Sequence, residues 1–156
     1  MPNRDIDEYD HHSHMERAFA LAREAAARGD DPFGSVLVRD DEVIMESSNR
    51  VVTEDDLRRH PELHLAYRAM RELSPEERSE TVMYTSTEPC PMCASGIRRA
   101  ELARVVYSTS APDLEELRGS SSPVRATRIL EGVTDVVGDV RNGDGRRMLD
   151  EWLPER

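Results

Sequence analysis

Apolar residues occur in two kinds of run along this chain: short β-rich runs, and longer stretches with helical spacing. Runs such as Ser35–Val38 and Thr81–Thr85 are short and rich in β-branched residues, which is typical of buried strands. The longer stretches place apolar residues three and four positions apart, which is typical of helices packed on one face. The short runs predict five strands, near residues 35–38, 43–47, 81–85, 104–108 and 135–140.

Capping residues help to define the predicted helices between these strands. Ser13 and Glu16 have the spacing of a capping box before an alanine-rich helix that reaches Arg28, and Gly29 is a typical stop. Residues 1–12 precede this helix, and we expect them to form a flexible N-terminal arm. Further helices are predicted over 61–73, 91–100 and 123–130 and at the C-terminus, with a short capped turn at 74–77 and a mobile loop at 119–122.

The order of these elements predicts an α/β fold. The strands near 81, 104 and 135 are joined through helices, and helical crossovers favour parallel neighbours. The two strands around the Asp40-Asp41 turn form an antiparallel hairpin. The expected architecture is a three-layer α/β/α domain over residues 13–156 with a mixed five-stranded sheet. A chain of 156 residues is long enough for one such core.

The charge is strongly acidic. The chain has 32 acidic and 21 basic residues, and every basic residue is Arg, which gives a formal net charge of −11. Large acidic charge keeps proteins soluble in high salt, so the composition favours a halophilic protein over a generic acidic protein from a GC-rich genome. Nucleic acid is a less expected partner, because phosphates require a basic surface. Arg58-Arg59 and Arg98-Arg99 are the basic doublets nearest the motifs described next.

A split motif contains both cysteines of the chain. His60-Pro61-Glu62 is followed thirty residues later by Pro89-Cys90-Pro91-Met92-Cys93. One imidazole and two thiolates provide three ligands for zinc, and a catalytic zinc keeps its fourth position for water. Proline favours the first position of a helix, so His60 and Cys90 are each expected directly before a helix. Glu62, which is not a ligand in this scheme, is suited to carry protons.

Other interpretations of the same motif are a redox pair or half of a structural four-ligand zinc site. Neither requires a His-x-Glu at this spacing. A second register is offered by His64, but Ala66 then stands where a carboxylate is needed, so His60 is preferred. Two cysteines committed to a metal favour reducing cytoplasm. The polar N-terminus and the lack of a long apolar run predict neither a secretory signal nor a membrane span.

These motifs resemble those of the cytidine deaminase superfamily. The likeness covers about residues 14–110, and the branch that contains guanine deaminases and tRNA adenosine deaminases is the most similar. It rests on four segments with their numbers in this chain: Pro32-Phe33-Gly34, Asn49-Arg50, the His60 triplet, and the stretch from Tyr84 to Ala94. Most members have Ala between the His and the Glu, where this chain has Pro61.

The resemblance implies a role for each site residue. His60, Cys90 and Cys93 are the zinc ligands, and Glu62 is the catalytic proton carrier. Asn49 matches a residue that contacts the substrate base, and Phe33 matches one near the pocket wall. Packing alone would also explain Phe33, and a strand end would explain Asn49.

The implied activity is hydrolytic deamination of a nucleobase or nucleoside with release of ammonia, and guanine is the leading substrate. The alternatives are a tRNA adenosine deaminase and a catalytically silent zinc domain. The family also implies a homodimer. The resemblance leaves open whether Trp152 near the C-terminus closes the pocket or anchors a helix.

Overall fold

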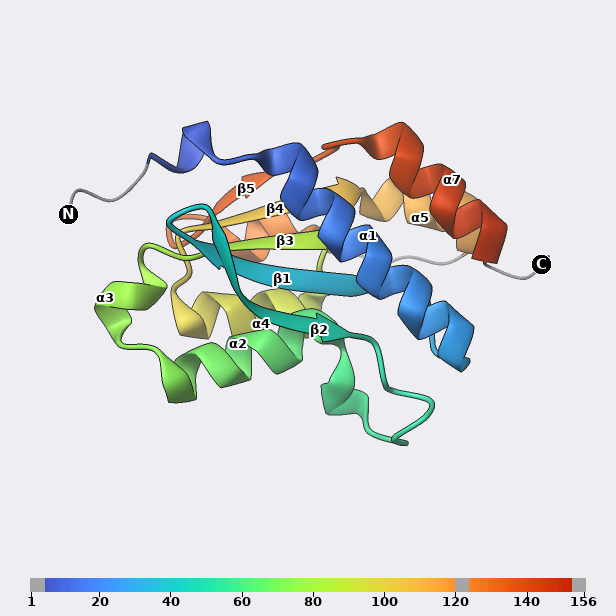
Figure 1. The fold of residues 1–156 in the computed structure, drawn as a ribbon, viewed down its shortest axis with the longest axis horizontal. Helices are drawn as coiled ribbons and strands as arrows, with labels where there is room; N and C mark the ends of the chain where they lie inside the picture. The colour runs from blue at the N-terminus through green and yellow to red at the C-terminus, as the bar shows by residue number, and fades with distance from the viewer. Residues whose placement is uncertain (1–4, 120–123, 153–156) are drawn as a thin grey trace.

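The computed structural model describes residues 5–119 and 124–152 and has a five-stranded sheet between two layers of helices (Figure 1). The strand order is β2-β1-β3-β4-β5. The strands are β1 (Gly34–Arg39), β2 (Glu42–Ser48), β3 (Val82–Thr87), β4 (Arg104–Thr109) and β5 (Asp135–Val137). The α-helices are α1 (His11–Arg28), α2 (Pro61–Glu72), α3 (Pro75–Arg78), α4 (Pro91–Ala100), α5 (Ala111–Arg118), α6 (Ala126–Leu130) and α7 (Asn142–Trp152). Two 3-10 helices, η1 (Ile6–Glu8) and η2 (Leu57–Arg59), complete the described elements.

The pairing of the strands confirms the predicted mixed sheet. β1 is antiparallel to both β2 and β3, whereas β3, β4 and β5 run parallel to one another. The parallel pairs follow from their helical crossovers, α4 between β3 and β4, and α5 with α6 between β4 and β5. Asp40 and Asp41 both adopt positive φ, 54° and 63°, which allows the tight turn of the hairpin.

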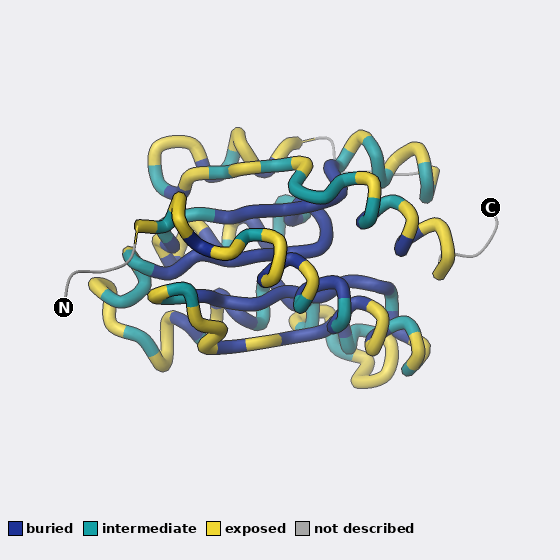
Figure 2. The backbone as a smooth tube through the Cα atoms, turned by 45° about the horizontal axis from the view of Figure 1, so that its top comes forward, coloured by how far each residue is buried: buried dark blue, intermediate teal, exposed yellow. Residues whose placement is uncertain are grey.

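Alternating residues of the strands build a core on each face of the sheet. Val36, Val82 and Tyr84 pack toward α1 and α7, whereas Leu37 and Met83 pack toward α2, α4 and α6. Figure 2 shows this burial as a dark interior between partly exposed helices. The sheet is thus covered on both sides, and its central strand β3 is buried along its whole length.

Glycine allows α1 to lie very close to β1. A Cβ built on Gly34 would lie 2.4 Å from the carbonyl oxygen of Ala18 and 2.6 Å from the backbone nitrogen of Ala22. The alanine-rich face of α1 provides the other half of this close contact. Any larger residue at position 34 would push the helix away from the strand that leads out of the site described below.

The N-terminal segment differs from its prediction. α1 begins at His11, and the carboxylate of Asp10 accepts a hydrogen bond from the Ser13 backbone N–H at 3.1 Å, so Ser13 is not the capping residue. Tyr9 is buried, and its hydroxyl accepts a hydrogen bond from the Asp40 backbone N–H at 2.8 Å. The expected flexible arm is therefore wrong for residues 5–12, because an aromatic anchor fixes them to the hairpin turn. Residues 1–4 lie outside the described residues.

The histidines of this segment also belong to the folded part. His14 is buried, with its Nε2 2.7 Å from Asp41 Oδ1, and His11 Nδ1 lies 2.6 Å from the hydroxyl of Tyr84. These contacts join the first turns of α1 to the sheet and to the hairpin turn.

α5 was not predicted, although its sequence has typical end signals. The Ser110 hydroxyl accepts a hydrogen bond from the Asp113 backbone N–H, Pro112 lies in the first turn, and Gly119 ends the helix at φ 81°. The polar composition of this segment hid the pattern. The remaining predicted loop, 120–122, lies outside the described residues.

The other boundaries agree closely with their predictions. The capping box of Ser74 and Glu77 at α3 is confirmed. α6 begins at Ala126, later than predicted, and β5 ends at Val137 because the chain turns at Asp139, where φ is 62°. None of the helices within residues 5–119 and 124–152 is long and apolar enough to cross a membrane.

Candidate active site

Three of the predicted residues meet where two helices begin. The ligand atoms of His60, Cys90 and Cys93 all lie within 4.8 Å of one another. His60 directly precedes α2, Cys90 directly precedes α4, and Cys93 lies in the first turn of α4. The three residues come from two helices that pack side by side beneath the sheet (Figure 1).

The sequence explains why these helices begin here. Pro61 and Pro91 each occupy the first helical position, where the missing N–H costs nothing. Neither His60 nor Cys90 forms the side-chain capping hydrogen bond that Ser or Asp would form. Their side chains are therefore available as metal ligands. The positive N-terminal ends of α2 and α4 favour thiolates beside them.

The donor set fits zinc. One imidazole and two thiols are ligands that Zn²⁺ binds in catalytic sites, where a fourth position remains for water. The group contains no fourth His, Cys, Asp or Glu side chain among the described residues. A closed structural site usually has four protein ligands, so the three-ligand arrangement matches a catalytic site better.

The three groups also share protons through hydrogen bonds. Hydrogen bonds from Cys93 and from His60 lower the pKa of Cys90 to about 4, against the opposing effect of burial. The hydrogen bond between His60 and Cys90 raises the pKa of His60. A second hydrogen bond, between Cys93 and Cys90, raises the pKa of Cys93 together with burial. A thiolate at Cys90 is the form that a metal requires.

Glu62 lies at the floor of the same site and is only 5% exposed. Burial, followed by the charge of Cys90, raises the pKa of Glu62 to about 7. The hydroxyl of Ser35 donates toward Glu62 Oε1 at 3.4 Å and toward Thr85 Oγ1 at 2.7 Å. A buried carboxyl with this pKa is able both to accept and to donate a proton near neutral pH.

A cavity of about 210 Å³ opens over these residues. Phe33 lines its wall, as predicted for a residue near the pocket. The cavity is lined by Phe33, His60, Glu62, Thr87, Glu88, Pro89, Cys90, Ala111, Leu114 and Arg118.

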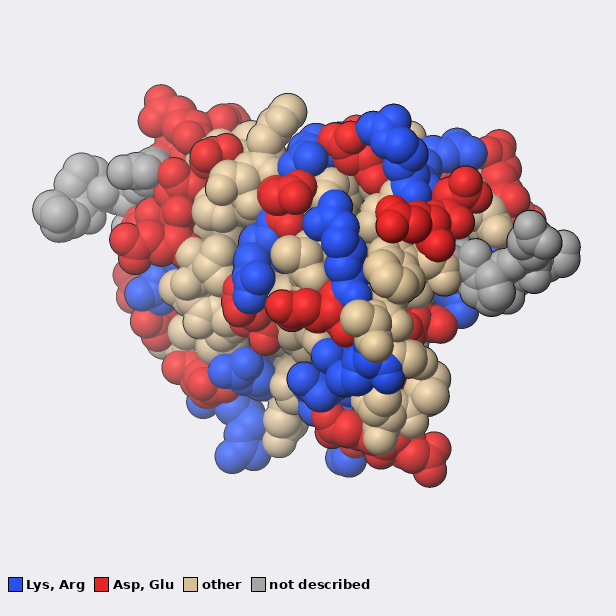
Figure 3. Space-filling model, turned by 45° about the vertical axis from the view of Figure 1, so that its right-hand side comes forward, with Lys and Arg blue, Asp and Glu red and all other residues tan. Residues whose placement is uncertain are grey.

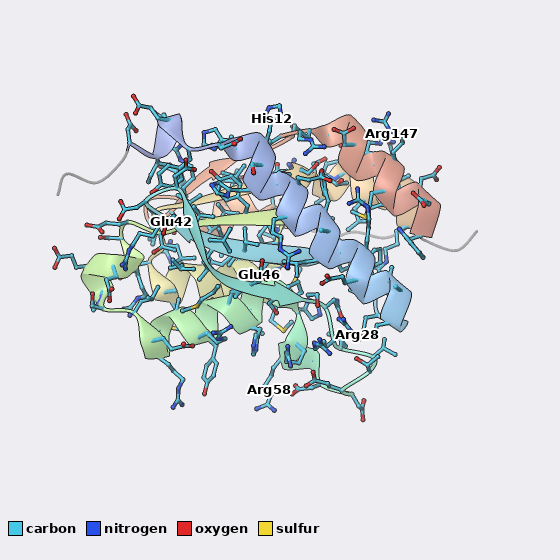
Figure 4. All side chains as sticks on the ribbon, viewed as in Figure 1. His12, Arg28, Glu42, Glu46, Arg58 and Arg147 are labelled. Atoms are coloured by element: carbon cyan, nitrogen blue, oxygen red, sulfur yellow. The ribbon has the colours of Figure 1, made fainter. Side chains whose placement is uncertain are left out.

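Asn49 is placed differently from the other predicted site residues. It is buried, and its Oδ1 accepts a hydrogen bond from the Val51 backbone N–H at 2.9 Å, but it is not among the cavity-lining residues. Arg28, which lies at the end of α1 (Figure 4), donates to the Asn49 carbonyl at 2.8 Å and to the Asp30 carboxylate at 3.0 Å. These contacts fix the loop after β2, and a direct contact of Asn49 with a base stays a prediction.

Sequence reasoning missed the far wall of the cavity, which α5 provides through Ala111, Leu114 and Arg118. It also missed Glu88, whose carboxylate accepts hydrogen bonds from the backbone N–H groups of Ala111 and Ala126. The Ser110 cap would have revealed the helix, but nothing in the sequence links Glu88 to the starts of α5 and α6.

His64 is not part of the candidate ligand group of His60, Cys90 and Cys93. It lines a separate groove of about 540 Å³ on the outer side of α2, together with Tyr67 and Met70. His60 belongs to the ligand group instead, so the arrangement agrees with the chosen register. Trp152 is 40% exposed at the end of α7 and is not among the cavity-lining residues.

Comparison with known proteins agrees with this geometry. The sequence model of the cytidine and deoxycytidylate deaminase zinc-binding region matches residues 8–109, which contain all three candidate ligands and Glu62. The chain belongs to the cytidine and deoxycytidylate deaminase family. The protein is therefore a deaminase that uses zinc and hydrolyses a C–N bond.

Two curated relatives show the range of this family. The chain is 36% identical over 107 residues to a guanine deaminase of Bacillus subtilis strain 168, a match covering 68% of this chain and 69% of that protein. It is 37% identical over 98 residues to a tRNA-specific adenosine deaminase of Agrobacterium fabrum, a match covering 63% of this chain and 64% of that protein.

A solved structure confirms the fold. The guanine deaminase of Nitrosomonas europaea superimposes with a TM-score of 0.80, over 97% of this chain and 87% of that chain. The identity is 18%, so the likeness concerns the fold alone.

Proposed function

We propose that this deaminase acts on a free nucleobase or nucleoside, with guanine as its leading substrate. In this proposal His60, Cys90 and Cys93 hold the zinc, and Glu62 carries the protons. The observation that carries it has two parts: the three candidate ligand atoms lie within 4.8 Å of one another, and His60, Glu62 and Cys90 line a cavity of about 210 Å³ whose walls are partly apolar. A cavity of this small volume suits a flat base better than a polymer.

The chemistry divides between the metal and the chain. Zinc, when bound, supplies a Lewis acid that brings the pKa of a coordinated water toward about 7. Glu62 accepts a proton from the attacking water and passes it to the ring nitrogen beside the amino-bearing carbon. A C–O bond forms at that carbon. Glu62 then takes the remaining proton of the added hydroxyl group and delivers it to the amine, so that the C–N bond breaks, a carbonyl forms at the carbon and ammonia leaves.

The surroundings of Glu62 support this cycle. Burial keeps bulk water away from the carboxylate, and the Ser35 hydroxyl faces one of its oxygens. The free N–H groups at the starts of α2 and α4 lie on the same side and favour developing negative charge. Phe33 offers an apolar wall for the base.

Replacement of Glu62 tests the mechanism. Glu62→Ala is expected to keep zinc and the fold, and to lose about 10²–10⁴-fold or more in turnover, because one group serves several proton transfers. Metal content and ammonia release from a panel of free bases and nucleosides measure this. Glu76→Ala, at an exposed position of α3, is the control. Wild-type turnover in the Glu62→Ala variant would show that another residue carries the protons.

A tRNA adenosine deaminase is the second candidate, favoured by the Agrobacterium fabrum relative. The Arg58-Arg59 doublet does not support it. Arg58 pairs with Asp56 at 2.9 Å and Arg59 with Glu54 at 2.7 Å, so acidic neighbours balance this doublet. Figure 3 likewise shows acidic and basic side chains intermixed over the face in view. Deamination of an anticodon stem-loop but not of free bases would favour this candidate, and no ammonia from any substrate would favour a silent zinc domain.

We also propose a homodimer that uses the outer face of α2. Tyr67 is 53% exposed and Met70 is 39% exposed, and both line the groove beside His64. Leu57 in the preceding segment is 61% exposed. Exposed apolar groups gathered in this way are typical of contact surfaces, and a second copy is the proposed occupant. Light scattering at micromolar concentration should give twice the monomer mass, and Tyr67→Glu should lower it. A monomer at every concentration contradicts the proposal.

A further inference from the structure

One charged side chain of the cavity has no part in the proposed proton transfers. Arg118 is the last residue of α5, lines the cavity, and its side chain is 28% exposed. Glu62, at the floor, is 5% exposed. Arg118 therefore lies at the rim of the same cavity, beside whatever part of a substrate is remote from the reacting carbon.

Two contacts hold this guanidinium in place. Its Nη2 donates to Asp31 Oδ2 at 2.7 Å, and its central carbon lies 5.5 Å from the centre of the Phe33 ring. Asp31 and Phe33 both belong to the segment just before β1, so they join the end of α5 to the opposite wall. A guanidinium has five N–H donors and no acceptor, so donors remain after the contact with Asp31.

The length of α5 separates the two ends of the cavity. The Ala111 backbone N–H, at the start of α5, donates to Glu88, two residues before Cys90. Eight residues of α-helix cover about 10 Å along the axis, so Arg118 lies one helix length away from that anchored end. A base whose amino-bearing carbon reaches Glu62 thus presents another edge to Arg118.

We infer that Arg118 is a specificity-determining residue that recognises two adjacent hydrogen-bond acceptors on the base, which are O6 and N7 in guanine. The inference rests on the proposed deamination at this site. Arginine binds this pair of acceptors in a bidentate manner, and it has no acceptor for an amino group. In guanine the reacting amino group is on C2, across the ring from O6 and N7. In adenine the amino group of that same edge is the leaving group, so the pair of acceptors is missing.

Substrate analogues separate recognition from a structural role. The bases are guanine, 2-aminopurine, which keeps the 2-amino group but lacks O6, and 2,6-diaminopurine, which has an amino group in place of O6. Arg118→Met keeps an apolar stem against Phe33 but removes the donors. We expect kcat/KM for guanine to fall about 10- to 100-fold and that for 2-aminopurine to change by less than about threefold. In the same variant, the kcat/KM for 2,6-diaminopurine should rise relative to the kcat/KM for guanine.

Binding provides the same comparison without turnover. Equilibrium dialysis of guanine and of 2-aminopurine against Glu62→Ala and the double variant with Arg118→Met should show the loss for guanine alone. Arg146→Gln is the matched control, because Arg146 ties α5 to α7 through Asp113 at 2.9 Å but does not line the cavity. This control should leave the ratio of the two substrates unchanged.

The outcomes are distinct. Equal losses for guanine and 2-aminopurine, or no loss, overturn the inference and leave the deaminase intact. A wild-type protein that deaminates another base and does not bind guanine also overturns it. Failure of the proposed function looks different, because then no tested base or nucleoside releases ammonia from the zinc-loaded protein.

Discussion

Both carboxylate oxygens of Glu88 accept hydrogen bonds from Nε of Arg125, each at 3.0 Å. The same carboxylate accepts the backbone N–H groups that begin α5 and α6, those of Ala111 and Ala126. Burial by itself would raise the pKa of Glu88, but these hydrogen bonds outweigh it and hold the pKa below its ordinary value. Glu88, two residues before the candidate ligand Cys90, thus fixes the far wall of the cavity.

Replacement of this carboxylate should weaken the fold and the cavity together. Glu88→Gln places an N–H₂ group against donors, so we expect unfolding to become easier by about 1–3 kcal/mol. Chemical denaturation measures the free energy of unfolding. The exposed Glu76→Gln is the control and should change it by less than about 0.5 kcal/mol. Equal stability of Glu88→Gln and wild type would show that α5 and α6 are held by packing alone.

Metal analysis tests the ligand assignment. We expect one zinc per chain, lost together with stability in Cys93→Ala and His60→Ala, because metal binding is coupled to folding. His64→Ala should keep its zinc, since His64 lies in the outer groove. The opposite pattern, zinc retained without His60 and lost without His64, would falsify the assignment.

The buried carboxylate of Asp30 should make the free energy of unfolding depend on pH in the acid range. Its side chain is fully buried, and it accepts hydrogen bonds from the backbone N–H groups of Val52 and Thr53 at 2.9 Å. Burial opposes ionisation, but these bonds and that from Arg28 hold the pKa of Asp30 below its ordinary 3.8. A lowered pKa stabilises the fold above pH 3.8, and this contribution is lost as the pH falls through the lowered value.

The Asp30→Asn variant isolates that contribution. Its free energy of unfolding should lie about 1–3 kcal/mol below wild type at pH 7, and the gap should narrow as the pH falls below 4. Asp55→Asn, at an exposed position of the loop that Asp30 contacts through Val52 and Thr53, is the matched control. A gap that stays constant across this acid range would mean that the charge of Asp30 contributes nothing.

Salt should stabilise this acidic protein. With a formal net charge of −11 and no Lys, self-repulsion loosens the fold at low ionic strength. The Debye length falls from about 30 Å at 0.01 M to about 3 Å at 1 M salt, so the melting temperature and activity should rise over that range, most steeply at its low end. Thermal melts measure this. A melting temperature that stays constant or falls between 0.01 M and 1 M salt would indicate that the all-Arg composition reflects codon usage instead.

The sequence by itself determined the elements that carry local signals. Proline at the start of α2 and of α4 located both helices, and with them His60 and Cys90, because a missing N–H is tolerated only there. The helices predicted between β3, β4 and β5 likewise indicated that these strands run parallel, because a helical crossover favours parallel neighbours. The spacing of two cysteines and one His-x-Glu was sufficient to predict a zinc group, because metal chemistry permits few ligand sets.

Only the tertiary structure decided what depends on long-range contacts. Tyr9 looked like part of a loose arm, but it is fixed by the Asp40 backbone, thirty-one residues away. Glu88 meets Arg125 across thirty-seven residues, and Arg118 meets Asp31 across eighty-seven. Hydrogen bonds of this kind depend on which loops the sheet brings together, and local patterns do not encode that geometry. The candidate zinc ligands could therefore be predicted from the sequence, whereas the walls of the cavity and its rim arginine could not.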